Sequence, residues 1–137
     1  MTGEAMSSSP HGEIYAVIKR YADAWAADDI RAIVDCHHDQ VIFHNFGRSP
    51  LAGTHLGKPA CLVVLKKVRE KTNRRLVSIQ DVLAGEHFGM IVAVERFDRG
   101  DAVIEIERMF RYRVRDGKLA ECWVYDEDQR LVDECWA

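Results

Sequence analysis

The sequence has no long apolar run, no block of one charge and no closely spaced pair of cysteines. Its 137 residues carry a net charge of −3, with 19 basic and 22 acidic side chains intermixed. The longest apolar runs are too short to cross a bilayer, and no stripe of Lys and Arg could follow a phosphate backbone. We therefore expect neither a membrane nor a nucleic acid as a partner.

Metal sites and disulfides have little support in the sequence. The four cysteines are not arranged as CxxC, and disulfides are rare in cytoplasmic proteins. His37 and His38 are adjacent, so their side chains point in different directions and make a poor metal clamp. We expect no metal, no cofactor, and buried or half-buried thiols at Cys36, Cys61, Cys122 and Cys135.

Residues 1–12, MTGEAMSSSPHG, are small and polar. They lack the basic start and apolar run of a signal peptide, so we expect a disordered tail at 1–12 and a cytoplasmic protein. The remaining chain is long enough to bury one core, and 47% of all residues are hydrophobic. Since no repeat or linker interrupts it, we expect one domain over residues 13–137.

Helical spacing dominates the first half of the chain. Apolar residues recur three and four positions apart over residues 13–27, which predicts an amphipathic helix. Asp29 can cap a short second helix, and a third is expected over about 60–71. Between them, we expect a strand at 41–46 and an irregular connection, rich in Gly and Pro, at 47–59.

The second half has the alternating pattern of strands. Turns near Gly85 and Gly100 and a hairpin signal at Asp116-Gly117 separate these strands. Helices first and antiparallel strands afterwards predict an α+β domain, with helices on one face of a curved, mostly antiparallel sheet. Strands are expected at 76–83, 88–97, 102–114 and 119–125, and a closing helix at 129–136.

Charged residues interrupt the apolar faces of two of these strands. Arg96 and Asp98 share a face with Val92, and Arg108 shares a face with Phe110. Arg and Asp are rarely fully buried. Such charges therefore indicate either an end of the sheet that reaches water or a cavity with a polar lining.

Three segments resemble ketosteroid-isomerase-like and SnoaL-like proteins of the NTF2-like superfamily. Residues 21–46, YADAWAADDIRAIVDCHHDQVIFHNF, resemble the opening of ketosteroid isomerases, and residues 47–60, GRSPLAGTHLGKPA, resemble the SnoaL-like branch. Residues 113–137, RVRDGKLAECWVYDEDQRLVDECWA, resemble the end of that branch. The resemblance implies a cone-shaped fold around a pocket for a small, largely apolar molecule. Isomerases, cyclases, epoxide hydrolases and non-catalytic modules all use this fold.

The likeness to the isomerases is uneven at their reactive residues. Tyr21 matches the tyrosine that donates a hydrogen bond to the developing enolate. Asn45 stands where the carboxylate that shuttles the proton lies, and an amide cannot take a proton near neutral pH. Met109 and Phe110 stand near the second oxyanion donor, and neither can donate. The resemblance therefore argues against steroid isomerisation.

Limonene-type epoxide hydrolases provide a second comparison. They combine an aromatic-x-Asn strand, an Arg-x-Asp strand and a further Asp on the last strand. Residues 43–45, FHN, resemble the first, and residues 96–98, RFD, the second. In that chemistry one Asp takes a proton from water, the other acts as the acid, and Arg bridges both. The last Asp would fall at Tyr125, and a shift by one residue to Asp126 turns the side chain to the opposite face.

SnoaL-like cyclases offer a third comparison. One Asp on their last strand is the acid/base of an aldol-type ring closure, and Asp126 resembles it. Asp126 has an alternative role as the cap of the closing helix. His44 is a further group suited to proton transfer near pH 7. Alternation places His44 and Asn45 on opposite faces, so we expect at most one of them in the pocket.

Three hypotheses for function remain open. They are cofactor-independent acid/base cyclisation or isomerisation of an apolar, polyketide- or terpenoid-like substrate, limonene-type epoxide hydrolysis, and a non-catalytic ligand-binding or dimerisation module. We also expect a homodimer formed through the convex face of the sheet, with Met109, Cys122 and Trp123 contributing. We predict catalytic roles for His44, Arg96, Asp98 and Asp126, and ligand-binding roles for Tyr21, Trp25, Phe43, Asn45, Phe110 and Trp123.

Overall fold

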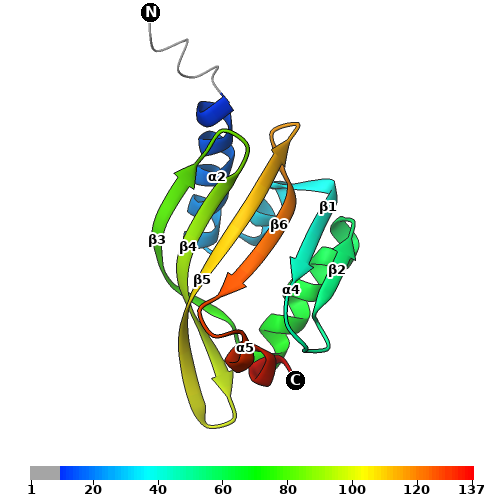
Figure 1. The fold of residues 1–137 in the computed structure, drawn as a ribbon, viewed down its shortest axis with the longest axis vertical. Helices are drawn as coiled ribbons and strands as arrows, with labels where there is room; N and C mark the ends of the chain where they lie inside the picture. The colour runs from blue at the N-terminus through cyan, green and yellow to red at the C-terminus, as the bar shows by residue number, and fades with distance from the viewer. Residues whose placement is uncertain (1–9) are drawn as a thin grey trace, which may run out of the picture.

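The computed structural model describes residues 10–137, which fold into four α-helices and one six-stranded sheet. The strand order is β2-β1-β6-β5-β4-β3, and β1 and β6 are the parallel neighbours in an otherwise antiparallel sheet. The helices α2 and α4 lie behind the sheet in Figure 1, and α5 lies at one end of it. The expected α+β class with a curved sheet is confirmed. The elements are α2 (Pro10–Ala26), α3 (Ile30–Asp35), β1 (His37–Asn45), β2 (Gly53–Leu56), α4 (Lys58–Thr72), β3 (Arg75–Ala84), β4 (Gly89–Arg99), β5 (Ala102–Arg115), β6 (Lys118–Asp126) and α5 (Gln129–Trp136).

Most element boundaries fall within a few residues of the expected ones. Helix α2 begins at Pro10, three residues before the predicted start, and residues 1–9 of the predicted tail lie outside the described part of the chain. Asp29 caps α3 as expected, since its carboxylate accepts a hydrogen bond from the backbone N–H of Ala32 at 3.1 Å. The connection at 47–59 was expected to be irregular, but it contains β2, which pairs with β1 at the edge of the sheet.

The core lies between the sheet and the helices. Ile18 on α2 is fully buried and packs over β4 at Gly89. A Cβ at Gly89 would overlap the Ile18 side chain, so glycine allows the helix to approach the strand this closely. All four cysteines are free and buried, which confirms the prediction of buried thiols. No helix within residues 10–137 is long and apolar enough to span a membrane.

Strand alternation decides which side chains face the helices. On β1, Asn45 is buried on the helix side and His44 lies on the opposite face. On β6, Asp126 shares the helix side with Cys122, while Tyr125 is on the outer face. Asn45 and Asp126 are therefore the members of their pairs that face the interior.

Candidate functional site

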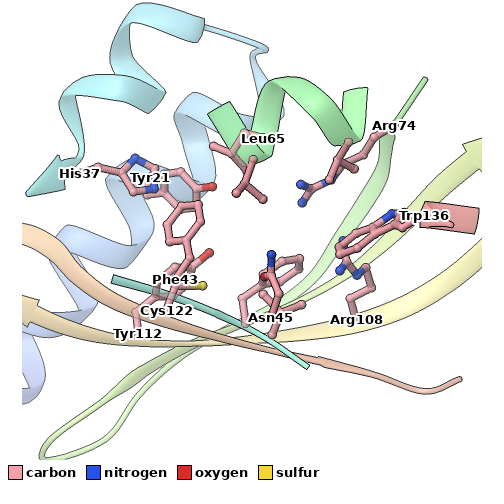
Figure 2. A pocket seen from close by; sticks show the side chains of 14 residues that line it. Tyr21, His37, Phe43, Asn45, Leu65, Arg74, Arg108, Tyr112, Cys122 and Trp136 are labelled. Carbon is pink, nitrogen blue, oxygen red and sulfur yellow. The ribbon is translucent and has the colours of Figure 1, made fainter. Parts of the chain in front are cut away.

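Two adjoining cavities lie between the sheet and the helices, and the residues Tyr21, Leu65 and Arg74 line both. The inner cavity has a volume of about 30 Å³, enough for roughly one water molecule. The outer cavity has a volume of about 670 Å³, within the range of small-molecule sites. Figure 2 shows the inner cavity, with Leu65 between its two ends.

The outer cavity has an apolar wall and a charged rim. Its rim includes an exposed ion pair in which Arg69 Nη2 lies 3.0 Å from Asp28 Oδ1. The Arg74 guanidinium lies 5.8 Å from the ring of Trp25 and 5.9 Å from the ring of Phe110, so it lies where the two cavities adjoin. The apolar wall is formed by Trp25, Ile30, Ile33, Leu62, Leu76 and Ile79.

Tyr21 from α2 and Tyr112 from β5 form one end of the inner cavity. Their rings meet edge-on with centroids 5.7 Å apart, and Tyr21 meets His37 in the same way at 5.3 Å. Burial raises the pKa of both tyrosines above the usual value of 10, so both hydroxyls keep their protons at neutral pH. This end of the cavity therefore offers neutral hydroxyl groups.

His37 is the buried imidazole at the same end. Its Nδ1 lies 2.8 Å from the carbonyl oxygen of Ile33. A carbonyl can only accept, so Nδ1 carries the hydrogen and Nε2 keeps a lone pair. Burial lowers the pKa of His37 to about 4, and the imidazole is neutral at pH 7. His37 thus supplies a proton acceptor in the wall of the inner cavity.

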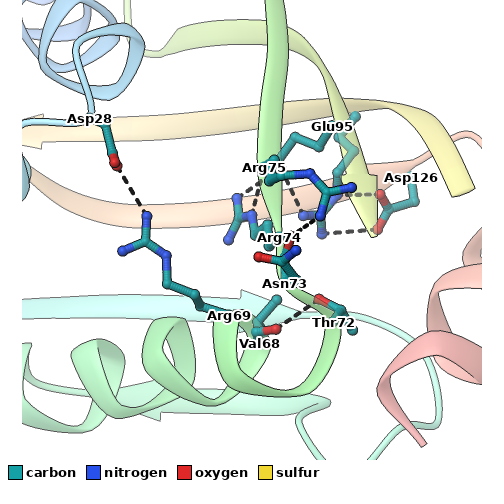
Figure 3. Close-up of polar contacts among 10 residues, drawn as sticks. Asp28, Val68, Arg69, Thr72, Asn73, Arg74, Arg75, Glu95 and Asp126 are labelled. Atoms are coloured by element: carbon teal, nitrogen blue, oxygen red, sulfur yellow. Dashed lines mark hydrogen bonds and ion pairs between the residues drawn. The ribbon is translucent and has the colours of Figure 1, made fainter. Parts of the chain in front are cut away.

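Four charged side chains form a network beside the other end of the inner cavity, and Figure 3 shows three of them, Arg74, Glu95 and Asp126. Arg108 on β5 contacts Asp126 on β6 through Nε at 2.5 Å and Nη2 at 3.3 Å, and Glu95 on β4 through Nη1 at 3.0 Å. Arg74 binds Glu95 through Nε at 2.5 Å and Nη2 at 2.8 Å. Two guanidinium groups and two carboxylates therefore balance one another.

Glu95 and Arg74 keep their charges in spite of burial. Burial alone would raise the pKa of Glu95, but Arg74 and Arg108 outweigh it and lower that pKa below 4.5. Burial likewise opposes the charge of Arg74, and Glu95 outweighs it and raises the pKa of that guanidinium. Glu95 stays an anion and is poorly suited to donate a proton.

Asp126, predicted to be catalytic, lies in this network. Its side chain is 3% exposed, binds Arg108 with both oxygens and lines neither cavity. It does not cap the closing helix, because Asp128 does so by accepting a hydrogen bond from Leu131 N at 3.0 Å. The structure therefore places Asp126 beside the site, one residue removed from the cavity.

His44 lies on the outer face of the sheet, away from both cavities. Its Nε2 is 2.5 Å from Glu121 Oε2, and its ring stacks on Trp123 with centroids 5.1 Å apart. The guanidinium carbon of Arg111 lies 4.2 Å from the centre of the Trp123 ring. Trp123, predicted to bind ligand, lies outside both cavities, because its neighbour Cys122 takes the inner face.

Arg96 and Asp98 occupy the outer face of β4. Arg96 pairs with Glu105 at 3.1 Å, and Asp98 pairs with Arg75 at 3.1 Å. Of the two alternatives left open for these charges, the structure shows an outer face that reaches water, because strand alternation places Glu95 on the inner face instead. The structure therefore does not bring the four residues predicted to be catalytic together.

Most of the residues that were predicted to bind ligand do line a cavity. Among them, Tyr21 lines both cavities and Trp25 lines the outer one. Sequence reasoning did note Arg108 as a charge on an apolar face, and Glu95 gave the same signal. Arg74 follows a helix end and Trp136 lies at the chain end, where no periodic pattern could identify them. The inner cavity is also lined by three residues that were predicted to bind ligand, Phe43, Asn45 and Phe110. The lining residues for which the sequence predicted no functional role are His37, Arg74, Glu95, Arg108, Tyr112 and Trp136.

Within residues 10–137, no group of three or more His, Cys, Asp or Glu side chains could hold a metal ion. No curated protein matches the chain significantly.

Solved structures share the fold. Bal32a, from a soil-derived mobile gene cassette, matches with a TM-score of 0.83 and 17% identity over 94% of this chain and 100% of its own. An NTF2-like protein from Burkholderia xenovorans matches at 0.72 and 21% over 91% and 96% of the two chains. An LEH-like epoxide hydrolase from M. tuberculosis matches at 0.66 and 13% over 89% and 86%. These matches confirm the expected NTF2-like fold.

The sequence itself matches a family model. The model of the SnoaL-like domain covers residues 18–122, which is more than half of the chain. The chain belongs to the SnoaL-like domain family.

Proposed function

We propose that the chain is an enzyme that moves a proton within a small, largely apolar carbonyl compound, and so isomerises or cyclises it without a cofactor. One observation carries the proposal. A neutral imidazole and a neutral phenol, His37 and Tyr21, line the same small inner cavity at the end of a larger apolar one. An acceptor and a donor in a site sheltered from water are the groups that enolisation needs.

The two groups have complementary roles in such a reaction. The apolar body of the substrate lies in the outer cavity, and its carbonyl end reaches the inner one. His37 Nε2 takes a proton from the carbon next to the carbonyl, and the Tyr21 hydroxyl donates a hydrogen bond to the oxygen on which negative charge develops. In an isomerisation the imidazolium then returns the proton to another carbon. In a cyclisation the enolate carbon bonds to a second carbonyl carbon of the substrate, and the imidazolium protonates the alkoxide oxygen that results. Because its pKa is about 4, His37 is a weak base, and a fairly acidic C–H suits it best.

Asp126 fits this scheme as a positioning residue. Its two contacts hold the Arg108 guanidinium against the inner cavity. The catalytic roles predicted for His44, Arg96 and Asp98 would require these side chains to act from the opposite face of the sheet. Substitution at these positions therefore distinguishes catalysis on the outer face of the sheet from catalysis in the inner cavity.

Hydrogen–deuterium exchange of 2-tetralone tests the proposal without knowledge of the natural substrate. The C1 protons of this apolar ketone are acidic, and proton NMR in D₂O follows their loss. We expect the protein to accelerate exchange, and His37→Gln to reduce the catalysed rate at least about 100-fold. Tyr21→Phe should also reduce it, whereas His44→Gln should not.

Two results would contradict this assignment. If the wild-type protein binds 2-tetralone and gives no acceleration over buffer, the chain is a binding module for such compounds. If His37→Gln keeps the full rate while His44→Gln loses it, the catalytic group lies on the outer face.

Epoxide hydrolysis is the second candidate, and one contact favours it. Arg108 bridges the carboxylates of Glu95 and Asp126, as the Arg of limonene-type hydrolases bridges two Asp residues. In that reaction a carboxylate takes a proton from water, the hydroxide attacks a ring carbon, the C–O bond breaks and the oxygen is protonated. The low pKa of Glu95 counts against it as the acid. Formation of diol from styrene oxide, lost in Asp126→Asn, would support this candidate, and its absence in the wild type would exclude it for this substrate.

A further inference from the structure

Trp136, the last residue of α5, presents a buried donor without a partner. Its side chain is 3% exposed and lines the inner cavity. Among the residues that the structure describes, no acceptor lies within hydrogen-bond reach of its Nε1. An unsatisfied buried donor destabilises a fold, so this N–H indicates an acceptor that residues 10–137 do not supply.

Arg108 adds donors at the same end of the cavity. Its guanidinium carbon lies 5.2 Å from the centre of the Trp136 ring, and Figure 2 shows both side chains at the end away from Tyr21. A guanidinium has five N–H groups, and Arg108 uses three of them on Asp126 and Glu95. These bonds leave two Arg108 N–H groups, beside Trp136 Nε1, that a further acceptor could engage.

The charge balance decides which acceptor fits. Arg74 and Arg108 are matched by Glu95 and Asp126, so the network has no surplus positive charge. A carboxylate would place an unpaired negative charge among buried groups, which is costly. An uncharged oxygen satisfies the same donors without that cost.

We propose that Trp136 Nε1 and Arg108 form a donor subsite for a second, uncharged oxygen of the ligand, such as a ketone, quinone or ester carbonyl. The proposal rests on the proposed function, because it assumes that the ligand body fills the outer cavity and its first carbonyl lies near Tyr21. The inferred substrate class is a compact apolar molecule that carries two uncharged oxygen functions at separate positions.

Calorimetric titration with four matched naphthalenes tests the subsite. They are 2-acetylnaphthalene, 2,3-diacetylnaphthalene, 2-acetyl-3-isopropylnaphthalene and 3-acetyl-2-naphthoate, whose substituents leave the ring from the same edge and so point together toward the inner cavity. We expect the diacetyl compound to bind about three- to tenfold more tightly than the isopropyl compound, the gain of one hydrogen bond to a neutral acceptor. The naphthoate should bind more weakly than the diacetyl compound. Trp136→Phe should abolish the diacetyl preference, and Trp123→Phe, on the outer face, should keep it.

A second readout does not depend on the Trp136→Phe variant folding. In the wild-type protein, the indole N–H resonance of Trp136 should move downfield on addition of the diacetyl compound and not on addition of the isopropyl compound. Equal affinities for the two compounds, tighter binding of the naphthoate, or an unmoved indole resonance would overturn the subsite while leaving the proposed function standing. Failure of all four naphthalenes to bind would overturn both.

Discussion

At the scale of single residues, Arg108 is held between two carboxylates and surrounded by aromatic rings. Its guanidinium carbon lies 5.2 Å from the ring centres of Phe97, Phe110 and Trp136, so it packs as well as pairs. The sequence marked this position as unusual, because a charge interrupts an apolar strand face. It could not say whether the charge reaches water, since that depends on the neighbouring strands that supply Glu95 and Asp126.

Replacing Arg108 by Leu should destabilise the protein strongly. The change leaves Asp126 without its guanidinium partner and Glu95 with Arg74 alone. We expect the free energy of unfolding in urea to fall by about 3–5 kcal/mol. Arg96→Leu, at an exposed pair on the same sheet, should change it by less than about 1 kcal/mol. Equal effects of the two substitutions would contradict the buried network.

The stability of the protein should depend on His37 between pH 6.5 and pH 4. Burial lowers the folded-state pKa of His37 from 6.5 to about 4. In this window the unfolded chain takes up a proton that the folded protein does not, so stability falls as the pH falls. At pH 4 the free energy of unfolding should therefore be lower by about 3 kcal/mol through this group.

Urea denaturation at pH 7.5 and pH 4.5 measures this effect. His37→Gln should remove most of the difference in unfolding free energy between the two pH values. Protonation of Glu95, whose folded-state pKa is depressed, weakens the fold only at still lower pH. An unchanged difference in the His37→Gln protein would show that His37 is not a buried neutral imidazole.

At the scale of elements, periodicity predicted every helix among residues 10–137 and five of the six strands. Strand β2 was not predicted, because its four residues, GTHL, lie in a segment whose glycines and prolines indicate a loop. Alternation also predicted that His44 and Asn45 face opposite sides. It could not identify the inner side, because the same pattern fits either face until α2 is placed on the sheet.

The contact of α2 with β4 gives a prediction for Gly89. A Cβ at this position would overlap the Ile18 side chain, so Gly89→Ala should lower the free energy of unfolding by about 1–3 kcal/mol. Gly85→Ala is the matched control, since its Cβ would make only an ordinary contact with the carbonyl oxygen of Phe88 at 3.5 Å. Thermal or urea denaturation of both variants measures the difference, and a neutral Gly89→Ala would contradict the packing.

At the scale of the whole molecule, the outer face of the sheet is the surface through which we propose two copies pair. Met109 is 40% exposed and Phe46 43%, and both lie near the stack of His44, Trp123 and Arg111. Cys122, expected on this surface, instead lines the inner cavity. The remaining apolar side chains still offer area for a partner.

Light scattering should report a particle of twice the chain mass of 15.7 kDa. Met109→Glu should shift the protein toward monomer, because it places a charge on the proposed contact surface. Val103→Glu, at an exposed site on the same strand beyond this cluster, should not. A wild-type protein that stays monomeric at high concentration would contradict the proposed homodimer.

The fold was more predictable from the sequence than the charged residues around its cavities. The resemblance of three sequence segments to SnoaL-like proteins led to the correct fold and matched Tyr21 to a pocket residue, while alternation left open whether His44 or Asn45 faces the pocket. The charged network was not predictable in the same way. Arg74 enters it because Asn73, the residue after α4, adopts a left-handed conformation with φ of 49°, and Trp136 reaches the inner cavity through the docking of α5. Both depend on tertiary contacts.

A crystal structure of the protein with 2-acetylnaphthalene tests the central claim most directly. We predict that the rings lie in the outer cavity between Trp25 and Leu65, with the carbonyl oxygen at the inner cavity near Tyr21. Density for the ligand on the outer face of the sheet beside Trp123, with both cavities free of it, would contradict the account.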